Sequence, residues 1–263
     1  MNVKKFSQKI FEIKHDNDFN NLAIELFEHQ YKNNLTYKQF IDLNNIDINS
    51  ITHYTKIPFL PIELFRTKKI ILKREKPSFF FKSSGTTNTI TSKHYIVDLN
   101  IYKKSIILGF DFFLKDPRKF AFLCLVPTTE EAPHSSLAFM CQELINASKS
   151  NYSGFFLRKE KLLLKTIMEC QQKNQNFIIL GLSFEILQFA EKNKVNMKNG
   201  IVIETGGTKK GKKRILKEEL HNKLMNAFNT KNIFSEYGMA ELLSQSYYIK
   251  KPYFQSPPWK KIL

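Results

Sequence analysis

Small hydroxylated side chains follow the apolar run 79–81 in an order that suits phosphate binding. Residues 82–94 read Lys-Ser-Ser-Gly-Thr-Thr-Asn-Thr-Ile-Thr-Ser-Lys-His, with no carboxylate among them. Glycine lets the backbone approach a phosphate closely, hydroxyl and N–H groups donate hydrogen bonds, and a lysine adds positive charge. The Gly-Lys-Ser/Thr core of a Walker loop is absent. The segment predicts phosphate binding by Ser83, Ser84, Gly85, Thr86, Thr87 and Lys93. A solvated turn is the alternative.

Two further segments place glycine and polar side chains directly after apolar stretches. Residues 233–242 read Ile-Phe-Ser-Glu-Tyr-Gly-Met-Ala-Glu-Leu, so an aromatic ring and a glycine precede Glu241. A carboxylate is a hard oxygen ligand of the kind that Mg²⁺ prefers; a carboxylate favoured by a helix dipole is the alternative. Gly206 and Gly207 offer a flat surface without Cβ atoms. The alternative for these glycines is a β–α turn that needs them for chain reversal alone.

Five segments, in their order along the chain, resemble the LuxE-type acyl-protein synthetase family of the adenylate-forming superfamily. The resemblance runs from about Phe79 to the last residue. It implies a ligase that uses ATP to activate a fatty or other carboxylic acid as acyl-AMP and then transfers the acyl group to a protein or carrier thiol. The matching segments are Phe-Lys-Ser-Ser-Gly-Thr-Thr (81–87), Ser-Lys-His (92–94), Glu-Thr-Gly-Gly-Thr-Lys (204–209), Glu-Tyr-Gly-Met-Ala-Glu-Leu-Leu-Ser-Gln (236–245) and Pro-Pro-Trp (257–259).

The resemblance also assigns roles to individual residues. The hydroxylated loop would hold the β- and γ-phosphates of ATP, with Lys93 as a catalytic residue beside it. Glu241 would be catalytic as well, as the Mg²⁺ ligand. His134 loosely matches a residue at the mouth of the acyl pocket, and a surface or helix-capping histidine is the alternative. The adenine ring would stack on Tyr237. The full set of adenine-binding residues would be Gly206, Gly207, Thr208, Tyr237 and Gly238. ATP and Mg²⁺ are therefore the implied cofactors, and an acyl reductase subunit or an acyl carrier protein is the implied partner.

The sequence departs from the family pattern at several points. Asn88 stands where the family has glycine, and Ala240 stands where it usually has threonine. No cysteine follows Cys170 to match the acyl-accepting cysteine of the family. The sequence ends at Leu263, before the ribose-binding aspartate and the C-terminal lid domain with its catalytic lysine. These departures predict that this chain alone does not complete acyl transfer. They also favour an alternative function, a non-catalytic protein that binds nucleotide or acyl groups or docks on a reductase subunit.

Composition restricts the remaining classes of function. The chain of 263 residues carries a net charge of +17, yet its basic residues are scattered and show no nucleic-acid recognition motif. We therefore expect no specific nucleic-acid partner. No apolar run has the roughly 20 residues of a membrane span, and the N-terminus lacks the apolar core of a signal peptide. The three cysteines show no metal-binding spacing. These features predict a cytoplasmic protein.

Apolar runs of strand length alternate with amphipathic stretches of helix length. Strands are expected at 119–127, 177–181, 200–204 and 233–235, with helices near 99–113, 135–148, 158–172, 184–194 and 213–228. This alternation predicts an α/β fold with a mainly parallel sheet flanked by helices. The resemblance identifies it as the large N-terminal portion of an adenylate-forming fold, with a helical lead-in at 1–78 packed on a core at 79–263. Ligands of such sheets bind beyond the carboxyl ends of the strands, where the loops 82–93, 204–209 and 236–241 are expected to lie.

Overall fold

The computed structural model describes residues 3–84, 90–206, 215–249 and 252–263. Its chain divides into two compact units. The first comprises Met1–Tyr102 with Ser256–Leu263, and the second comprises Lys103–Gln255. The predicted division into a helical lead-in at 1–78 and a core at 79–263 followed the extent of the family resemblance, and it stays a prediction.

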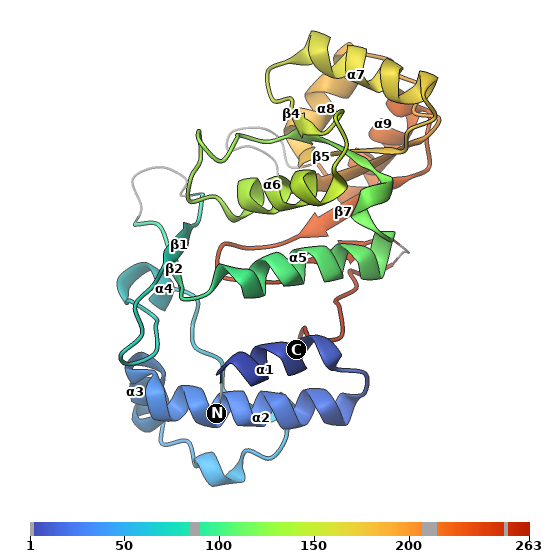
Figure 1. Ribbon diagram of the computed structural model, residues 1–263. Helices are drawn as coiled ribbons and strands as arrows, with labels where there is room; N and C mark the ends of the chain where they lie inside the picture. Colours follow the sequence, from blue (N-terminus) through green and yellow to red (C-terminus); the bar gives the residue numbers. More distant parts are fainter. Residues whose placement is uncertain (1–2, 85–89, 207–214, 250–251) are drawn as a thin grey trace. The chain divides into compact units, whose positions relative to one another are not determined.

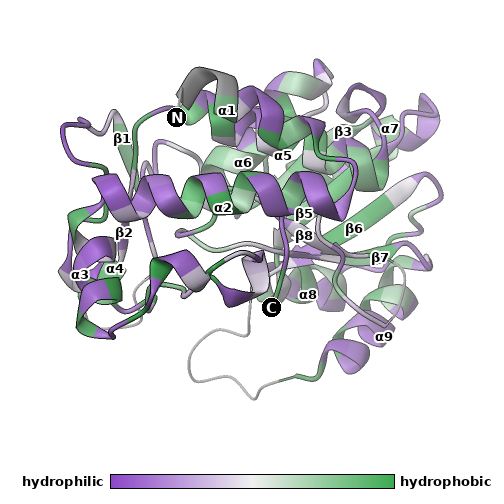
Figure 2. Ribbon diagram, turned by 90° about the horizontal axis from the view of Figure 1, so that it is seen from below, coloured by the Kyte–Doolittle hydropathy of each residue, from purple (hydrophilic) through white to green (hydrophobic). Residues whose placement is uncertain are grey.

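Most of the regular secondary structure of the first unit is helical (Figure 1). The longest is α2, whose start is capped because the carboxylate of Asp18 accepts a hydrogen bond of 3.0 Å from the backbone N–H of His15. A small core of Phe27, Tyr37 and Ile41 joins α2 to α3. Figure 2 shows α2 with mostly hydrophilic residues along its length. The elements are α1 (Val3–Lys9), η1 (Ile10–Glu12), α2 (Asp16–Asn33), α3 (Leu35–Leu43), η2 (Ile48–Ser50), η3 (Tyr54–Lys56) and α4 (Leu64–Thr67).

A β-hairpin completes the first unit. Strand β1 (Phe79–Lys82) pairs antiparallel with β2 (Lys93–Ile96) in a two-stranded sheet of its own. The expectation that the loop at 82–93 follows a strand of the parallel sheet is therefore wrong. The physical reason is loop length: the ten residues from Ser83 to Ser92 suffice for a hairpin connection, whereas a parallel crossover needs a dozen or more, usually including a helix.

The second unit is built around a six-stranded sheet in the order β4-β3-β5-β6-β7-β8. All neighbouring strands are parallel except β7 and β8, which pair antiparallel. The predicted strands are confirmed, and two short edge strands, β4 and β8, were not predicted. The bounds are β3 (Ala121–Leu125), β4 (Gly154–Phe155), β5 (Phe177–Leu182), β6 (Gly200–Thr205), β7 (Ile233–Tyr237) and β8 (Ser246–Tyr248).

Helices cover both faces of this sheet, so successive residues of its central strands are buried. Residues such as Ile179 and Val202 face a core formed with α7, α8 and α9. Their neighbours face the other way, where Phe122 meets Phe110 of α5 with ring centroids 5.2 Å apart. In Figure 2 strand β6 is drawn mostly in hydrophobic colours, as expected for a strand buried on both faces. The helices are α5 (Leu99–Leu114), which crosses the boundary between the units, η4 (Pro117–Lys119), α6 (Ser136–Ser148), α7 (Glu160–Gln172), α8 (Ser183–Lys192) and α9 (Lys217–Phe228).

The α/β class with a mainly parallel sheet flanked by helices is thus confirmed. Within the described ranges, no helix combines the length and the apolar character that a membrane crossing demands.

Candidate functional site

A cavity of about 920 Å³ opens in the second unit at the carboxyl ends of β5, β6 and β7. Its volume lies in the range of small-molecule sites, roughly 300–1,000 Å³. Its described lining includes residues that end or follow these strands, namely Ser183, Thr205, Gly206, Tyr237 and Gly238. This is the edge at which parallel α/β sheets bind their ligands.

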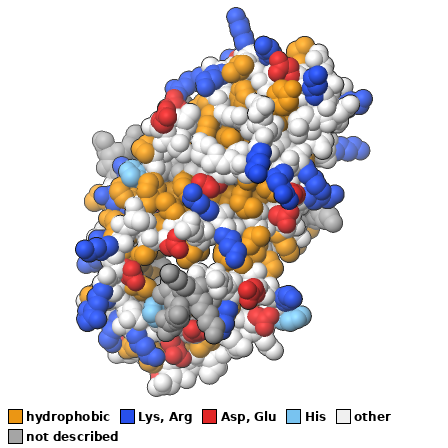
Figure 3. Space-filling model, viewed as in Figure 1, with side chains coloured by type: hydrophobic (Ala, Val, Ile, Leu, Met, Phe, Trp, Pro, Cys, Tyr) orange, Lys and Arg blue, Asp and Glu red, His pale blue; other side chains and the backbone are white. Residues whose placement is uncertain are grey.

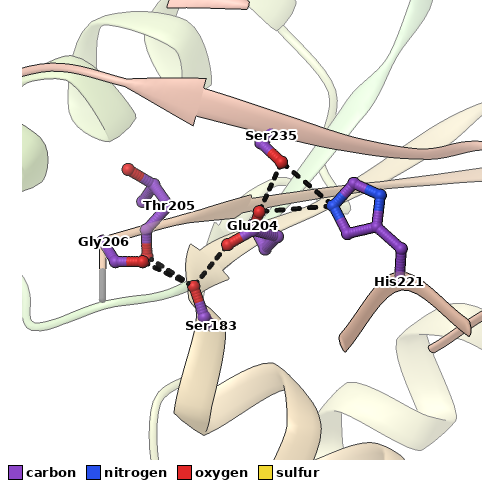
Figure 4. A network of polar contacts seen from close by, with 6 residues as sticks. All are labelled: Ser183, Glu204, Thr205, Gly206, His221 and Ser235. Atoms are coloured by element: carbon purple, nitrogen blue, oxygen red, sulfur yellow. Dashed lines mark hydrogen bonds and ion pairs between the residues drawn. The ribbon is translucent and has the colours of Figure 1, made fainter. Parts of the chain in front are cut away.

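A buried polar network lies at one side of the cavity, around the carboxylate of Glu204 (Figure 4). Ser183 donates a hydrogen bond to Oε2 of Glu204, and Ser235 donates one to Oε1. His221 Nε2 lies 3.0 Å from Ser235 Oγ and 3.4 Å from Glu204 Oε1. Because Ser235 uses its hydroxyl proton for Glu204, the imidazole Nε2–H acts as the donor toward both. The network therefore satisfies both oxygens of a buried carboxylate.

The electrostatics of Glu204 follow from these contacts. Burial disfavours the charged carboxylate, but hydrogen bonds from His221, Ser183 and Ser235 outweigh it and hold the pKa of Glu204 below its ordinary value. Throughout the described part of the chain, each fully buried side-chain nitrogen or oxygen has a hydrogen-bond partner. The network therefore contains a charged carboxylate whose hydrogen bonds come from side chains within the protein.

The turn after β6 is held by the same network. Gly206 has φ +78°, a left-handed conformation that a side chain would strain. Ser183 Oγ lies 2.8 Å from the Gly206 carbonyl oxygen and 3.1 Å from that of Thr205. A hydroxyl has one proton, so Ser183 serves one of its three acceptors at a time. These contacts fix the backbone where the predicted adenine surface begins; Gly207 and Thr208 lie outside the described residues.

A second buried pair shapes the turn after β7. Thr205 donates a hydrogen bond to Oε2 of Glu236, and both side chains are buried. A Cβ atom at position 238 would lie 2.6 Å from Oε1 of the same carboxylate. A side chain at position 238 would therefore displace the Glu236 carboxylate that Thr205 holds.

Tyr237 presents its ring to solvent beside the cavity. Its side chain is 42% exposed, and its ring lies 6.0 Å from that of Phe254. The structure thus brings together the described members of the predicted adenine site, Gly206, Tyr237 and Gly238, around one cavity. An aromatic face beside a narrow glycine-lined surface is suited to a flat ring.

Lys217, which was not predicted as a site residue, lines the same cavity from the first turn of α9. Its Nζ lies 3.8 Å from the ring centroid of Phe254 and 4.8 Å from that of Tyr248. Burial lowers the pKa of Lys217, and the negative charge of Glu204 opposes that effect. The lysine therefore adds a partly desolvated cation to a cavity whose buried groups are acidic.

Glu241 lies in the turn region between β7 and β8 and is partly buried. No helix begins there, so the alternative of a carboxylate at a helix N-terminus does not apply. In the described ranges no group of three or more His, Cys, Asp or Glu side chains is arranged to hold a metal ion. A lone carboxylate is compatible with Mg²⁺ that arrives bound to phosphate, since that ion commonly takes one or two protein carboxylates.

The predicted phosphate loop belongs to the first unit. Its base is closed by two hydrogen bonds, from Ser83 N to Ser92 O at 3.2 Å and from Ser92 N to Ser83 Oγ at 3.1 Å. Ser84 and Lys93 are exposed, and Lys93 Nζ lies 5.6 Å from the ring centroid of Phe80. Gly85, Thr86 and Thr87 lie outside the described residues. A joint site of this loop with the cavity of the second unit stays a prediction.

His134 directly precedes the N-cap of α6 and is partly exposed. The cap itself is Ser135, whose Oγ accepts a hydrogen bond of 3.2 Å from Ala138 N. The N-cap of α6 is thus Ser135 rather than His134, and the place of His134 at the mouth of an acyl pocket stays a prediction.

No family model and no curated protein matches the sequence. Among solved structures, the fold is similar to 2-hydroxyisobutyryl-CoA ligase, crystallised in an open conformation with 2-HIB-AMP and CoA. The TM-score is 0.57 at 10% identity, and the match covers 86% of this chain and 54% of the ligase. The fold is similar to the N-terminal part of adenylate-forming enzymes. ATP-bound MatB from Rhodopseudomonas palustris is matched with a TM-score of 0.48 at 11% identity, over 72% of this chain and 35% of MatB. The chain thus spans about half or less of these proteins.

Sequence reasoning missed most of the polar groups that shape the cavity. The available signals are polar residues within, at the end of or just after otherwise apolar strands, and a lysine and a histidine in the helix that follows β6. The missed residues are Ser183, Glu204, Lys217, His221, Ser235 and Glu236.

Proposed function

We propose that the chain binds ATP and activates a carboxylic acid as acyl-AMP. The single observation that carries this proposal is that Gly206, Tyr237 and Gly238, which come from two separate segments of the sequence, line one cavity at the carboxyl edge of a parallel sheet. The similar fold of a ligase crystallised with an acyl adenylate, 2-HIB-AMP, supports the same reading.

The cavity provides what an adenosine group needs. Tyr237 offers an exposed ring for stacking on adenine, and the backbone at Gly206 offers a surface that the base can approach closely. The Glu204 network and the Thr205–Glu236 pair hold these two turns in place before a ligand arrives. Such preorganisation reduces the cost of ordering on binding.

The reaction follows from the proposed ligands. A carboxylate oxygen of the acid attacks the α-phosphorus of ATP, a P–O bond forms, and the bond to pyrophosphate breaks with its electron pair leaving on pyrophosphate. Mg²⁺, when bound with ATP, would supply positive charge to the leaving phosphates. Glu241 is the residue proposed to hold that ion, while Ser83, Ser84, Gly85, Thr86, Thr87 and Lys93 are proposed to hold the phosphates. Catalysis of this kind rests on positioning and charge stabilisation.

The finer assignment is to acyl-protein synthesis of the LuxE type. It rests on the five sequence segments and names a fatty acid as substrate, a protein or carrier thiol as acceptor, and an acyl reductase subunit or acyl carrier protein as partner.

A second candidate is a non-catalytic protein that binds nucleotide or acyl groups, or docks on a reductase subunit. Ala240 favours it, because this buried residue has no hydroxyl where relatives place threonine. A lost hydrogen bond to a charged phosphate is worth roughly 1.5–3 kcal/mol.

Calorimetric titration with ATP and Mg²⁺ tests the nucleotide site. Tyr237→Ala is expected to weaken binding by about 1–3 kcal/mol, the usual range for loss of a base-stacking ring. Tyr253→Ala is the matched control, since this tyrosine is 75% exposed and lies outside the described lining of the cavity. Equal affinities of the two variants, or no binding of ATP by the unaltered chain, would contradict the proposed site.

A further inference from the structure

The first unit holds a strongly basic cavity of about 450 Å³. Its described lining includes one arginine and four lysines and no carboxylate. None of these five basic side chains makes an ion pair with a described carboxylate. They are Arg66, Lys68, Lys69, Lys82 and Lys93. Figure 3 shows Lys and Arg side chains on the side that carries α4 and the β1–β2 hairpin. The cavity concentrates positive potential without a counter-charge from the described residues.

The register of the hairpin adds to this charge. Lys82 of β1 stands directly opposite Lys93 of β2. Like charges at directly opposed positions of an antiparallel pair are destabilising. A bound anion at this position would remove that repulsion.

An apolar groove of about 500 Å³ adjoins the basic cavity within the same unit. Phe65 and Tyr95 line both. Along the chain, Lys93 lines the basic cavity, Tyr95 lines both, and Val97 lines the groove. Lys69 Nζ lies 5.3 Å from the ring centroid of Tyr95, which places a cation at that wall.

The groove exposes more apolar surface than a closed core would. Phe59 is 65% exposed and Val97 is 42% exposed, and both line it. Clustered exposed apolar side chains on a soluble surface mark binding sites. The groove therefore suits an apolar group, and the neighbouring cavity suits an anion.

We propose that the first unit binds an anionic amphiphile, with its apolar chain in the groove and its carboxylate or phosphate head in the basic cavity. This site goes beyond the proposed adenosine cavity, which lies wholly in the second unit. Lys93 belongs both to the basic cavity and to the proposed phosphate loop. Binding of the amphiphile and of the ATP phosphates is therefore expected to compete.

Titration calorimetry of the whole chain without nucleotide tests this site with four probes below their micelle-forming concentrations: dodecanoate, dodecyl phosphate, dodecanol and inorganic phosphate. At least one of the two amphiphilic anions is expected to bind about tenfold or more tightly than dodecanol and inorganic phosphate, because chain and charge both contribute. Comparison of the two anions identifies the preferred head group. If dodecanol or inorganic phosphate binds as tightly as both anions, the proposal is overturned.

Variants locate the binding. Lys69→Gln and Lys82→Gln are each expected to weaken binding of the preferred anion about fivefold or more, whereas Lys73→Gln, an exposed lysine outside the cavity, leaves it unchanged. Phe59→Ser is expected to weaken binding, with Phe112→Ser as the exposed control outside the groove. Tyr237→Ala should have no effect, which separates this site from the nucleotide site. Unaltered affinity in both lysine variants would refute the proposal.

Discussion

The carboxylates of Glu204 and Glu236 beside the cavity of the second unit are buried and hydrogen-bonded, whereas the basic side chains of the cavity in the first unit are exposed. Glu204 sits among Ser183, Ser235 and His221 with both oxygens satisfied. Lys69 and Lys82 instead make no ion pair with the described carboxylates. Buried networks fix geometry and are costly to break, while exposed charges attract a ligand and contribute little to folding. The two regions should therefore respond to mutation in opposite ways.

The largest expected effect comes from Glu204→Ala. It would leave buried Ser235 without its acceptor and would remove the shared carboxylate acceptor of Ser183 and His221. We therefore expect the free energy of unfolding to fall by about 3–5 kcal/mol. Urea denaturation followed by far-UV circular dichroism measures this loss. The fluorescence of Trp259, the single tryptophan, reports on the first unit, where the ring packs 5.1 Å from that of Phe11.

Glu191→Ala is the control for that variant, because Glu191 is an exposed carboxylate that lines the same cavity. It is expected to change the unfolding free energy by less than about 0.5 kcal/mol. Equal losses in the two variants would show that the buried network has no special part in the fold.

A smaller effect is expected in the dependence of stability on pH. The folded pKa of Glu204 lies below the ordinary value of 4.5. Its contribution is therefore present in full above pH 4.5 and is lost as the pH falls through the folded pKa. Denaturation of Glu204→Gln should show a shallower loss of stability below pH 4.5 than the unaltered chain. An identical slope in both proteins would mean that Glu204 does not carry this dependence.

The smallest effect is expected from Lys82→Gln. Removing one of two directly opposed lysines relieves repulsion, so the unfolding free energy should stay within about 0.5 kcal/mol of the original or rise slightly. Thermal denaturation monitored by Trp259 fluorescence measures this change in stability. A loss comparable with that of Glu204→Ala would remove the contrast between the two regions.

Sequence patterns predicted the buried strands well because their apolar runs are continuous. The run at 177–181, for example, became the fully buried start of β5. Tyr237 and Gly238 were also found, since an aromatic ring and a glycine directly follow a strand-like run. The strand before the loop at 82–93 was wrongly assigned to the parallel sheet, because the sequence of a four-residue apolar strand does not distinguish parallel from antiparallel pairing. The partners of Glu204 were missed because Ser183, His221 and Ser235 meet it only through packing of β5, β6, β7 and α9.

The proposed function is tested most directly by ATP–pyrophosphate exchange with labelled pyrophosphate, Mg²⁺ and a panel of short- and long-chain carboxylic acids. Exchange requires that acyl-AMP form reversibly, so it reports adenylation without any acyl acceptor. The account predicts exchange that depends on an added acid and on Mg²⁺, and that falls in Tyr237→Ala but not in Tyr253→Ala. Binding of ATP with no acid-dependent exchange across the panel would contradict catalysis and support the non-catalytic alternative.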